Sequence, residues 1–129
     1  MTRPDAPIGV LLVEDNDVYR ESLVFLLRRV DGLDVLGAVA DGAAATPACL
    51  ELDPDVVVVD FRLPDIDGAE VAADLRERCP RTAVVFLSAS AGRDEYDAAS
   101  SAGAALIRKD EGVDALVGAV RAAAGRRRE

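Results

Sequence analysis

An aspartate at the end of an apolar run is the residue of this chain best placed to do chemistry. Asp60 follows four consecutive valines, and Pro64 and Gly68 come shortly after it. The valines are typical of a strand buried on both faces, and the proline and glycine indicate a loop and then the start of a helix. In an open parallel sheet, reactive groups collect where the strands end. Asp60 is therefore placed like a reactive group.

Other polar side chains follow apolar runs in the same way: Glu14, Asp15, Ser88 and Lys109. Three carboxylates at one sheet edge would raise one another's pKa, and a divalent cation, best Mg²⁺ in an all-oxygen site, relieves the repulsion. Lys109 adds a point charge for an anion, and Ser88 can donate a hydrogen bond to a phosphoryl oxygen. A carboxylate nucleophile beside Mg²⁺ and a lysine is suited to forming an aspartyl phosphate.

Each of these residues also has a plainer interpretation. Glu14 and Asp15 could simply cap the following helix, although Asn16 is also able to do so. Lys109, the only lysine of the chain, could lie on the surface like most lysines, and Ser90 could compete with Ser88. We favour the chemical interpretation because all of the polar groups follow predicted strands.

The elements that would position these groups alternate along the chain. Apolar runs predict strands over residues 8–13, 34–40, 56–59, 83–87 and 104–107. Helical spacing and composition predict helices over residues 17–30, 43–52, 68–78, 93–102 and 114–124. Pro47 lies inside the second helix, and Thr46 as its N-cap would give a shorter one. The (βα)5 pattern predicts an α/β fold, a parallel sheet covered on both faces by right-handed crossovers.

The composition of the chain excludes several classes of function. The chain has 129 residues and fits one domain, and its net charge of -9 argues against a nucleic-acid surface. It contains no histidine, so histidine bases, ligands and phosphohistidine are excluded from this sequence. Cys49 and Cys79 lack a paired motif and are interpreted as reduced thiols. With no signal-peptide pattern and no membrane-spanning run, we expect a cytoplasmic location and no membrane contact.

Over almost its whole length the chain resembles the receiver domains of two-component response regulators, the CheY-like family. The resemblance rests on Glu14-Asp15, on Asp60 with its proline and glycine at the family's spacing, on Ser88-Ala89, and on Lys109. It implies a flavodoxin-like, doubly wound (βα)5 fold with a five-stranded parallel sheet of order 2-1-3-4-5. It also implies a phosphoprotein that signals rather than an enzyme with a substrate of its own.

The resemblance further implies a role for each site residue. Asp60 would accept a phosphoryl group from the phosphohistidine of a sensor histidine kinase. Asp15, Asp60 and the backbone carbonyl of Arg62 would bind Mg²⁺, with Glu14 acting mostly through water. Lys109 would bind the phosphoryl oxygens, and Ser88 would move to hydrogen-bond them.

The segment 106–110 is similar to the NarL/FixJ group, also called LuxR-type, whose members usually carry a C-terminal DNA-binding domain. We therefore expect residues 1–125 to form the receiver domain and residues 126–129 to be a basic tail or the start of a linker. The output would be transcription through a domain that is not in this chain. A sensor kinase and a second copy of the chain are the expected partners, without direct nucleic-acid contact by this domain.

The sequence departs from the family pattern at two places. Leu106 occupies the position of the usual Tyr or Phe, so Ser88 and Leu106 would couple through a smaller packing change. Arg62 and Ser90 lie where the family tunes phosphoryl hydrolysis, and Arg62 is expected to cover the site or to meet Glu14. A receiver that binds partners without phosphorylation is therefore an alternative. A haloacid-dehalogenase-type phosphohydrolase fits poorly, because Arg62 stands where it needs a second aspartate.

Overall fold

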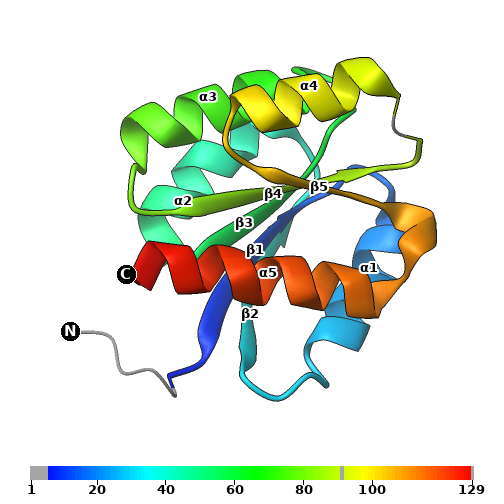
Figure 1. Cartoon of the computed structure of the whole chain (residues 1–129). Helices are drawn as coiled ribbons and strands as arrows, with labels where there is room; N and C mark the ends of the chain where they lie inside the picture. The colour runs from blue at the N-terminus through cyan, green and yellow to red at the C-terminus, as the bar shows by residue number, and fades with distance from the viewer. Residues whose placement is uncertain (1–5, 91, 129) are drawn as a thin grey trace.

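The computed structural model describes residues 6–90 and 92–128 and has a parallel sheet between two layers of helices (Figure 1). The five strands are β1 Ile8–Val13, β2 Leu33–Val39, β3 Val56–Asp60, β4 Ala83–Ser88 and β5 Ala105–Arg108, in the order β2-β1-β3-β4-β5. The helices are α1 Asp17–Leu27, α2 Ala45–Leu52, α3 Gly68–Arg78, α4 Arg93–Ser101 and α5 Val113–Arg128. The predicted fold class and strand order are confirmed.

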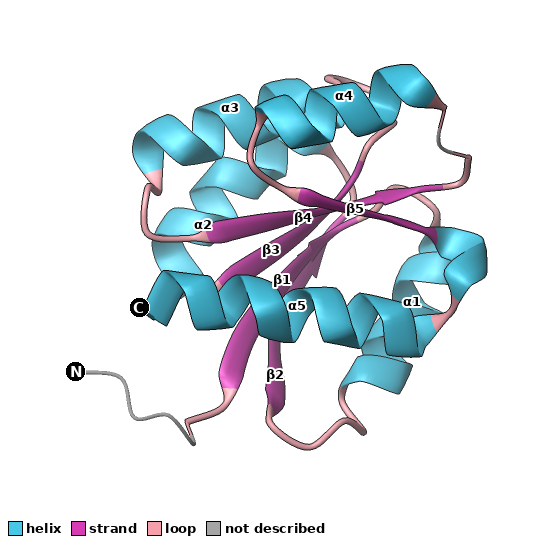
Figure 2. Ribbon diagram, in the orientation of Figure 1, coloured by secondary structure: helices cyan, strands magenta, loops and turns pink. Residues whose placement is uncertain are grey.

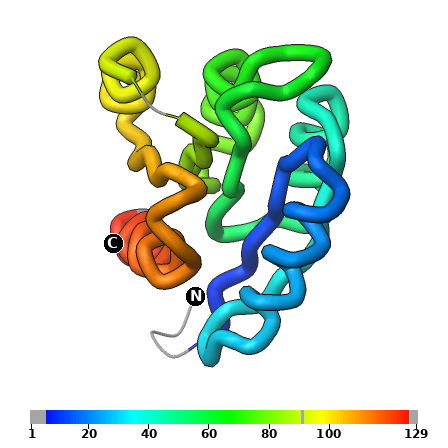
Figure 3. Tube along the Cα trace, turned by 90° about the vertical axis from the view of Figure 1, so that its right-hand side faces the viewer, coloured from blue at the N-terminus to red at the C-terminus, as the bar shows by residue number. Residues whose placement is uncertain are grey.

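Alternating side chains of the central strands divide the core in two. Val10, Val58 and Leu87 belong to a cluster with apolar side chains of α1 and α5. Val57 and Phe86 belong to a second cluster with side chains of α2, α3 and α4. Because neighbouring residues of a strand face opposite sides of the sheet, the continuous valine run supplies both cores. Figure 2 shows the strands in magenta between the two helix layers, and the end view in Figure 3 separates α4 in yellow from α5 in red.

The start of α2 differs from the prediction that Thr46 caps it. The helix begins at Ala45 after a 3₁₀ turn, Gly42–Ala44, whose first residue follows Asp41. The Asp41 side chain accepts a hydrogen bond from the amide of Ala44 at 2.9 Å and so caps this turn. The Thr46 hydroxyl instead donates to Asp74 Oδ2 of α3 at 2.5 Å. Pro47 remains in the first helical turn, where its missing N–H costs little.

The C-terminal ends of two helices, α1 and α5, also differ from the predicted bounds. Helix α1 ends at Leu27 instead of residue 30, because the chain turns into β2 through Gly32, whose φ of 86° favours glycine. Helix α5 continues to Arg128 instead of ending at Ala124. Residues 126–128, expected to be a basic tail or the start of a linker, continue this helix, and Glu129 lies outside the described residues. A domain boundary near residue 125 remains a prediction.

Both cysteines are free thiols, as expected. Cys49 lies on the buried face of α2, and burial raises the pKa of its thiol to about 11. No helix in the described part of the chain combines the length and apolarity needed to cross a membrane.

Candidate functional site

The carboxyl ends of the strands bring the predicted site residues together at one edge of the sheet. Glu14 and Asp15 follow β1, Asp60 is the last residue of β3, and Ser88 is the last residue of β4. Lys109 follows β5 directly and begins a short 3₁₀ turn, Lys109–Glu111. The parallel topology is the reason that residues so far apart in sequence share this edge.

Asp60 is nearly buried, with 5% of its surface exposed. Its Oδ2 accepts a hydrogen bond from Lys109 Nζ at 3.1 Å. Its Oδ1 accepts one from the backbone N–H of Arg62 at 3.1 Å. A buried carboxylate needs such partners to keep its charge, and both of them hold it at the end of the strand.

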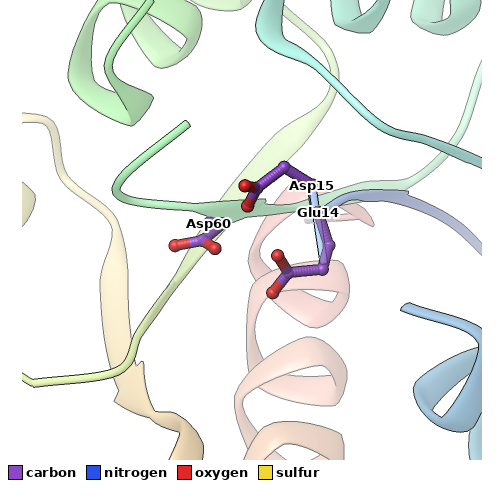
Figure 4. Close-up of side chains that lie close together, drawn as sticks. All are labelled: Glu14, Asp15 and Asp60. Carbon is purple, nitrogen blue, oxygen red and sulfur yellow. The ribbon is translucent and has the colours of Figure 1, made fainter. Parts of the chain in front are cut away.

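Two further carboxylates, those of Glu14 and Asp15, lie beside Asp60 (Figure 4). Glu14, Asp15 and Asp60 each offer an oxygen, and these oxygens lie within 4.8 Å of one another. Asp15 is exposed, whereas Glu14 and Asp60 are buried. Oxygens at this spacing can share one cation, and an exposed member leaves room for water ligands.

Glu14 has an oxygen left without a normal hydrogen bond. Its Oε2 accepts from the amide of Asn16 at 3.0 Å. Among the described residues Oε1 has no hydrogen-bond partner, although it lies 2.5 Å from Lys109 Nζ in an ion pair. The ion pair compensates the charge, and because a carboxylate oxygen can accept more than one contact, this buried oxygen keeps acceptor capacity. A hydrated cation in the acidic cluster is the kind of partner that would use it.

Lys109 places a positive charge beside the acidic cluster. Burial works against its charge, but the carboxylates of Glu14 and Asp60 outweigh burial and raise the pKa of Lys109 above its usual value. The ammonium also lies 4.5 Å from the centre of the Tyr19 ring. Lys109 is therefore held charged between two carboxylates and an aromatic face.

Ser88 and Leu106 lie together on the α4 side of the site. Ser88 is 2% exposed, and its hydroxyl donates to the backbone carbonyl of Ser90. Leu106 pairs in register with Phe86, and both belong to the core cluster beneath α2, α3 and α4. The Phe86 ring in turn meets Phe61 edge to face at 5.2 Å between centroids. The hydroxyl of Ser88 is thus directed to the following loop in this state.

Arg62 pairs with a residue of α4 and not with Glu14, which was one of the two arrangements expected for it. Its guanidinium pairs with Glu95 of α4 at 2.8 Å, and its side chain is 76% exposed. Glu95 also accepts a hydrogen bond from the amide of Gly92 at 2.8 Å. The ion pair therefore joins the loop after Asp60 to the first turn of α4.

Two residues of the site were missed by sequence reasoning, Tyr19 and Glu95. Tyr19 follows the acidic pair by one helical turn, which is the only local signal for it. Its contact with Lys109 joins residues from opposite ends of the chain, so spacing could not reveal it. Glu95 looks in the sequence like any acidic residue of a first helical turn.

Comparison with known proteins decides which family this arrangement belongs to. The family model described as "Response regulator receiver domain" matches residues 10–121. The chain belongs to this family. Receiver domains act in two-component signalling, where their general function depends on phosphorylation.

The curated relatives that this chain matches are longer proteins. The chain is 34% identical to a transcriptional regulatory protein named NarL of Mycobacterium tuberculosis, over 88% of this chain and 53% of that protein. It is 41% identical to the protein-glutamate methylesterase/protein-glutamine glutaminase 6 of Anaeromyxobacter dehalogenans, over 70% of this chain and 26% of that protein. The chain thus spans about half the length of the first relative and about a quarter of the second.

Solved structures agree with the fold. The signal receiver domain of the response regulator NarL from Mycobacterium tuberculosis superposes with a TM-score of 0.81 at 30% identity, covering 90% of this chain and 98% of that one. A LuxR-family two-component response regulator from Aurantimonas sp. SI85-9A1 gives a TM-score of 0.87 at 27% identity, covering 93% and 86%. The similarity to NarL/LuxR-type receivers expected from residues 106–110 is confirmed.

Proposed function

We propose that this receiver domain takes up a phosphoryl group on Asp60 and switches an output by that modification. The observation that carries the proposal is the environment of Asp60. Its buried carboxylate contacts Lys109 at 3.1 Å and shares a space less than 4.8 Å across with Glu14 and Asp15. A carboxylate nucleophile with a cation and an acidic cluster beside it has what phosphoryl transfer requires, which is positioning and charge stabilisation.

The transfer joins an Asp60 carboxylate oxygen to phosphorus and breaks the bond between phosphorus and the donor's histidine nitrogen. Lys109 lies against the same carboxylate and would bind the incoming phosphoryl oxygens. The Ser88 hydroxyl would leave the carbonyl of Ser90 and donate to one of these oxygens. The product is an acyl phosphate, whose extra charge changes the forces on the surrounding loops.

Mg²⁺ fits the acidic cluster because oxygens are its preferred ligands and because a buried oxygen of Glu14 lacks a hydrogen bond. Asp15, Asp60 and the backbone carbonyl of Arg62 would hold the ion, with Glu14 acting through water. When bound, Mg²⁺ would neutralise negative charge on the phosphoryl oxygens.

The proposed partners follow from the chemistry and the relatives. A cytoplasmic sensor histidine kinase would supply the phosphoryl group, since this chain has no histidine of its own. The relative named as a transcriptional regulatory protein is about twice as long as the matched part, so an output domain acting on transcription is proposed beyond this chain. A second copy of the domain is a further proposed partner. Apart from forming and losing its own phosphoryl group, the domain would catalyse no reaction.

One experiment tests this function. The protein is incubated with acetyl phosphate and Mg²⁺, and its intact mass is compared with that of Asp60→Asn and of a sample containing EDTA. We expect the mass of one phosphoryl group to appear on the wild type and to be absent from both controls. Normal Mg²⁺ binding without a mass gain would favour the alternative, a partner-binding receiver that is not phosphorylated. The observation in favour of that alternative is Leu106, which leaves the usual ring switch without a ring.

A further inference from the structure

The ring of Tyr19 lies over the ammonium of Lys109, and this contact is not needed to explain the acidic cluster. Lys109 Nζ is 4.5 Å from the ring centre, and the carboxylates of Glu14 and Asp60 lie at 2.5 and 3.1 Å from the same nitrogen. An ammonium over an aromatic face is attracted by the ring's quadrupole. Lys109 is thus held by two carboxylates and one aromatic face.

We propose that Tyr19 is a positioning residue for phosphoryl transfer, acting through Lys109 by means of its ring face. The proposal rests on the proposed function of Asp60. It assigns to Tyr19 no contact with the phosphoryl group itself. The ring favours the conformations of Lys109 in which the ammonium lies beside the Glu14 and Asp60 carboxylates. The ammonium is then already in position to bind the incoming phosphoryl oxygens.

The start of α1 fixes the backbone position from which the Tyr19 side chain extends. The amide of Tyr19 donates to Asn16 Oδ1 at 2.8 Å, which caps the helix directly after the acidic pair. Arg20 donates to the backbone carbonyl of Glu14 at 2.8 Å and pairs with Asp17 at 2.6 Å. The same short segment therefore supplies the acidic pair, the cap and the ring, and it ties all three to the end of β1.

The lysine side chain is long and flexible, and a cavity beside Lys109 leaves room for it to move. A cavity of about 210 Å³ lies between α1 and α5, with Tyr19, Leu87, Lys109 and Leu116 among its lining residues. Without the ring, the side chain of Lys109 could bend toward this cavity and carry the ammonium away from Asp60. The ring opposes that movement because it attracts the ammonium and so stabilises it in its present position beside the two carboxylates.

The kinetic test compares Tyr19→Leu, which removes the ring but keeps an apolar side chain, with Tyr19→Phe, which keeps the ring. Phosphorylation by acetyl phosphate with Mg²⁺ is followed by intact mass. We expect Tyr19→Leu to slow phosphorylation by about two- to five-fold, the range of one cation–π contact, and Tyr19→Phe to match the wild type. Equal rates in all three proteins, or equal slowing by both variants, would overturn the proposal. Thermal unfolding of each variant checks that it is folded.

A second measurement does not depend on phosphorylation. Lys109 is the only lysine of the chain, so lysine labelled with ¹³C at the ε position gives one side-chain NMR signal. The aromatic ring should shift the ε protons upfield in the wild type and in Tyr19→Phe, and this shift should be lost in Tyr19→Leu. The same ε shift in all three proteins would contradict the contact. A wild type that takes up no phosphoryl group overturns the proposed function instead, and the lysine signal then decides the contact alone.

Discussion

At the scale of single residues, the site is a balance between two buried carboxylates and one lysine. Glu14 and Asp60 are 1% and 5% exposed, and no other cation is recorded within ion-pair distance of them in the described part of the chain. Removing one partner of a buried charge pair leaves the other charges uncompensated. The residues that prepare the chemistry therefore also affect the stability of the fold.

Replacing Lys109 with methionine should destabilise the protein. The change leaves two buried carboxylates facing each other, and we expect the free energy of unfolding to fall by about 1–3 kcal/mol in the absence of divalent cations. Urea unfolding measures it, with Arg108→Met as the matched control because Arg108 is exposed and its guanidinium pairs with the exposed carboxylate of Asp110. Added Mg²⁺ should recover part of the loss. A Lys109→Met protein as stable as the control would show that the ammonium does not compensate the buried carboxylates.

At the scale of elements, the loop after β3 and the start of α4 are joined by Glu95. One oxygen of this carboxylate accepts from the amide of Gly92 and the other pairs with Arg62. The backbone N–H groups of Glu95 and Gly92, and then Arg62, hold the pKa of Glu95 below its usual value. A lowered folded-state pKa means that the stabilisation is present above the unfolded value of about 4.3 and is lost as the pH falls through the folded one.

Glu95→Ala should therefore loosen the first turn of α4 more than Arg62→Ala does. The first change removes both the helix cap and the ion pair, whereas the second removes only an ion pair whose arginine is 76% exposed. Amide hydrogen exchange at Gly92 and Tyr96 measures this, and exchange should be fastest in Glu95→Ala. If Arg62→Ala raises the exchange as much, the ion pair and not the cap holds the turn.

Some helices, strands and contacts of this fold could be predicted from the sequence, and others could not. Strands such as 8–13 and 56–59 were predictable because a strand buried on both faces is a continuous apolar run. The bounds of α3 were predictable because Gly68 marks its start and Pro80 follows its end. The start of α2 was not, because Asp41 caps a 3₁₀ turn that the composition does not signal. The Tyr19–Lys109 and Arg62–Glu95 contacts join residues far apart in the chain, so they needed the fold.

At the scale of the whole molecule, the site lies where two separately packed cores meet the sheet edge. Ser88 and Leu106 border the core beneath α4, whereas Tyr19 lies against the core beneath α1 and α5. Leu106 of β5 and Ala99 of α4 are both buried in the core beneath α4. A change at Asp60 should thus reach α4 and β5 through Ser88 and Arg62, with α2 remote from it.

Beryllofluoride, which mimics a phosphoryl group on a carboxylate, should change the hydrogen exchange of this part of the molecule. With Mg²⁺ and beryllofluoride we expect altered exchange over residues 93–108 and unchanged exchange over α2, Ala45–Leu52. Mass spectrometry of peptides resolves the two regions, and Asp60→Asn provides the unresponsive control. Altered exchange confined to α2 would contradict the prediction that α4 and β5 are the responding elements.

The central claim, that Asp60 is the phosphoacceptor, has a direct chemical test. After reaction with acetyl phosphate and Mg²⁺, sodium borohydride reduces an acyl phosphate to the alcohol and so converts the modified aspartate to homoserine. Peptide mass spectrometry then locates it. We expect homoserine at position 60 and at no other aspartate, and none without Mg²⁺. Homoserine at Asp15 or elsewhere, with position 60 unmodified, would contradict the account.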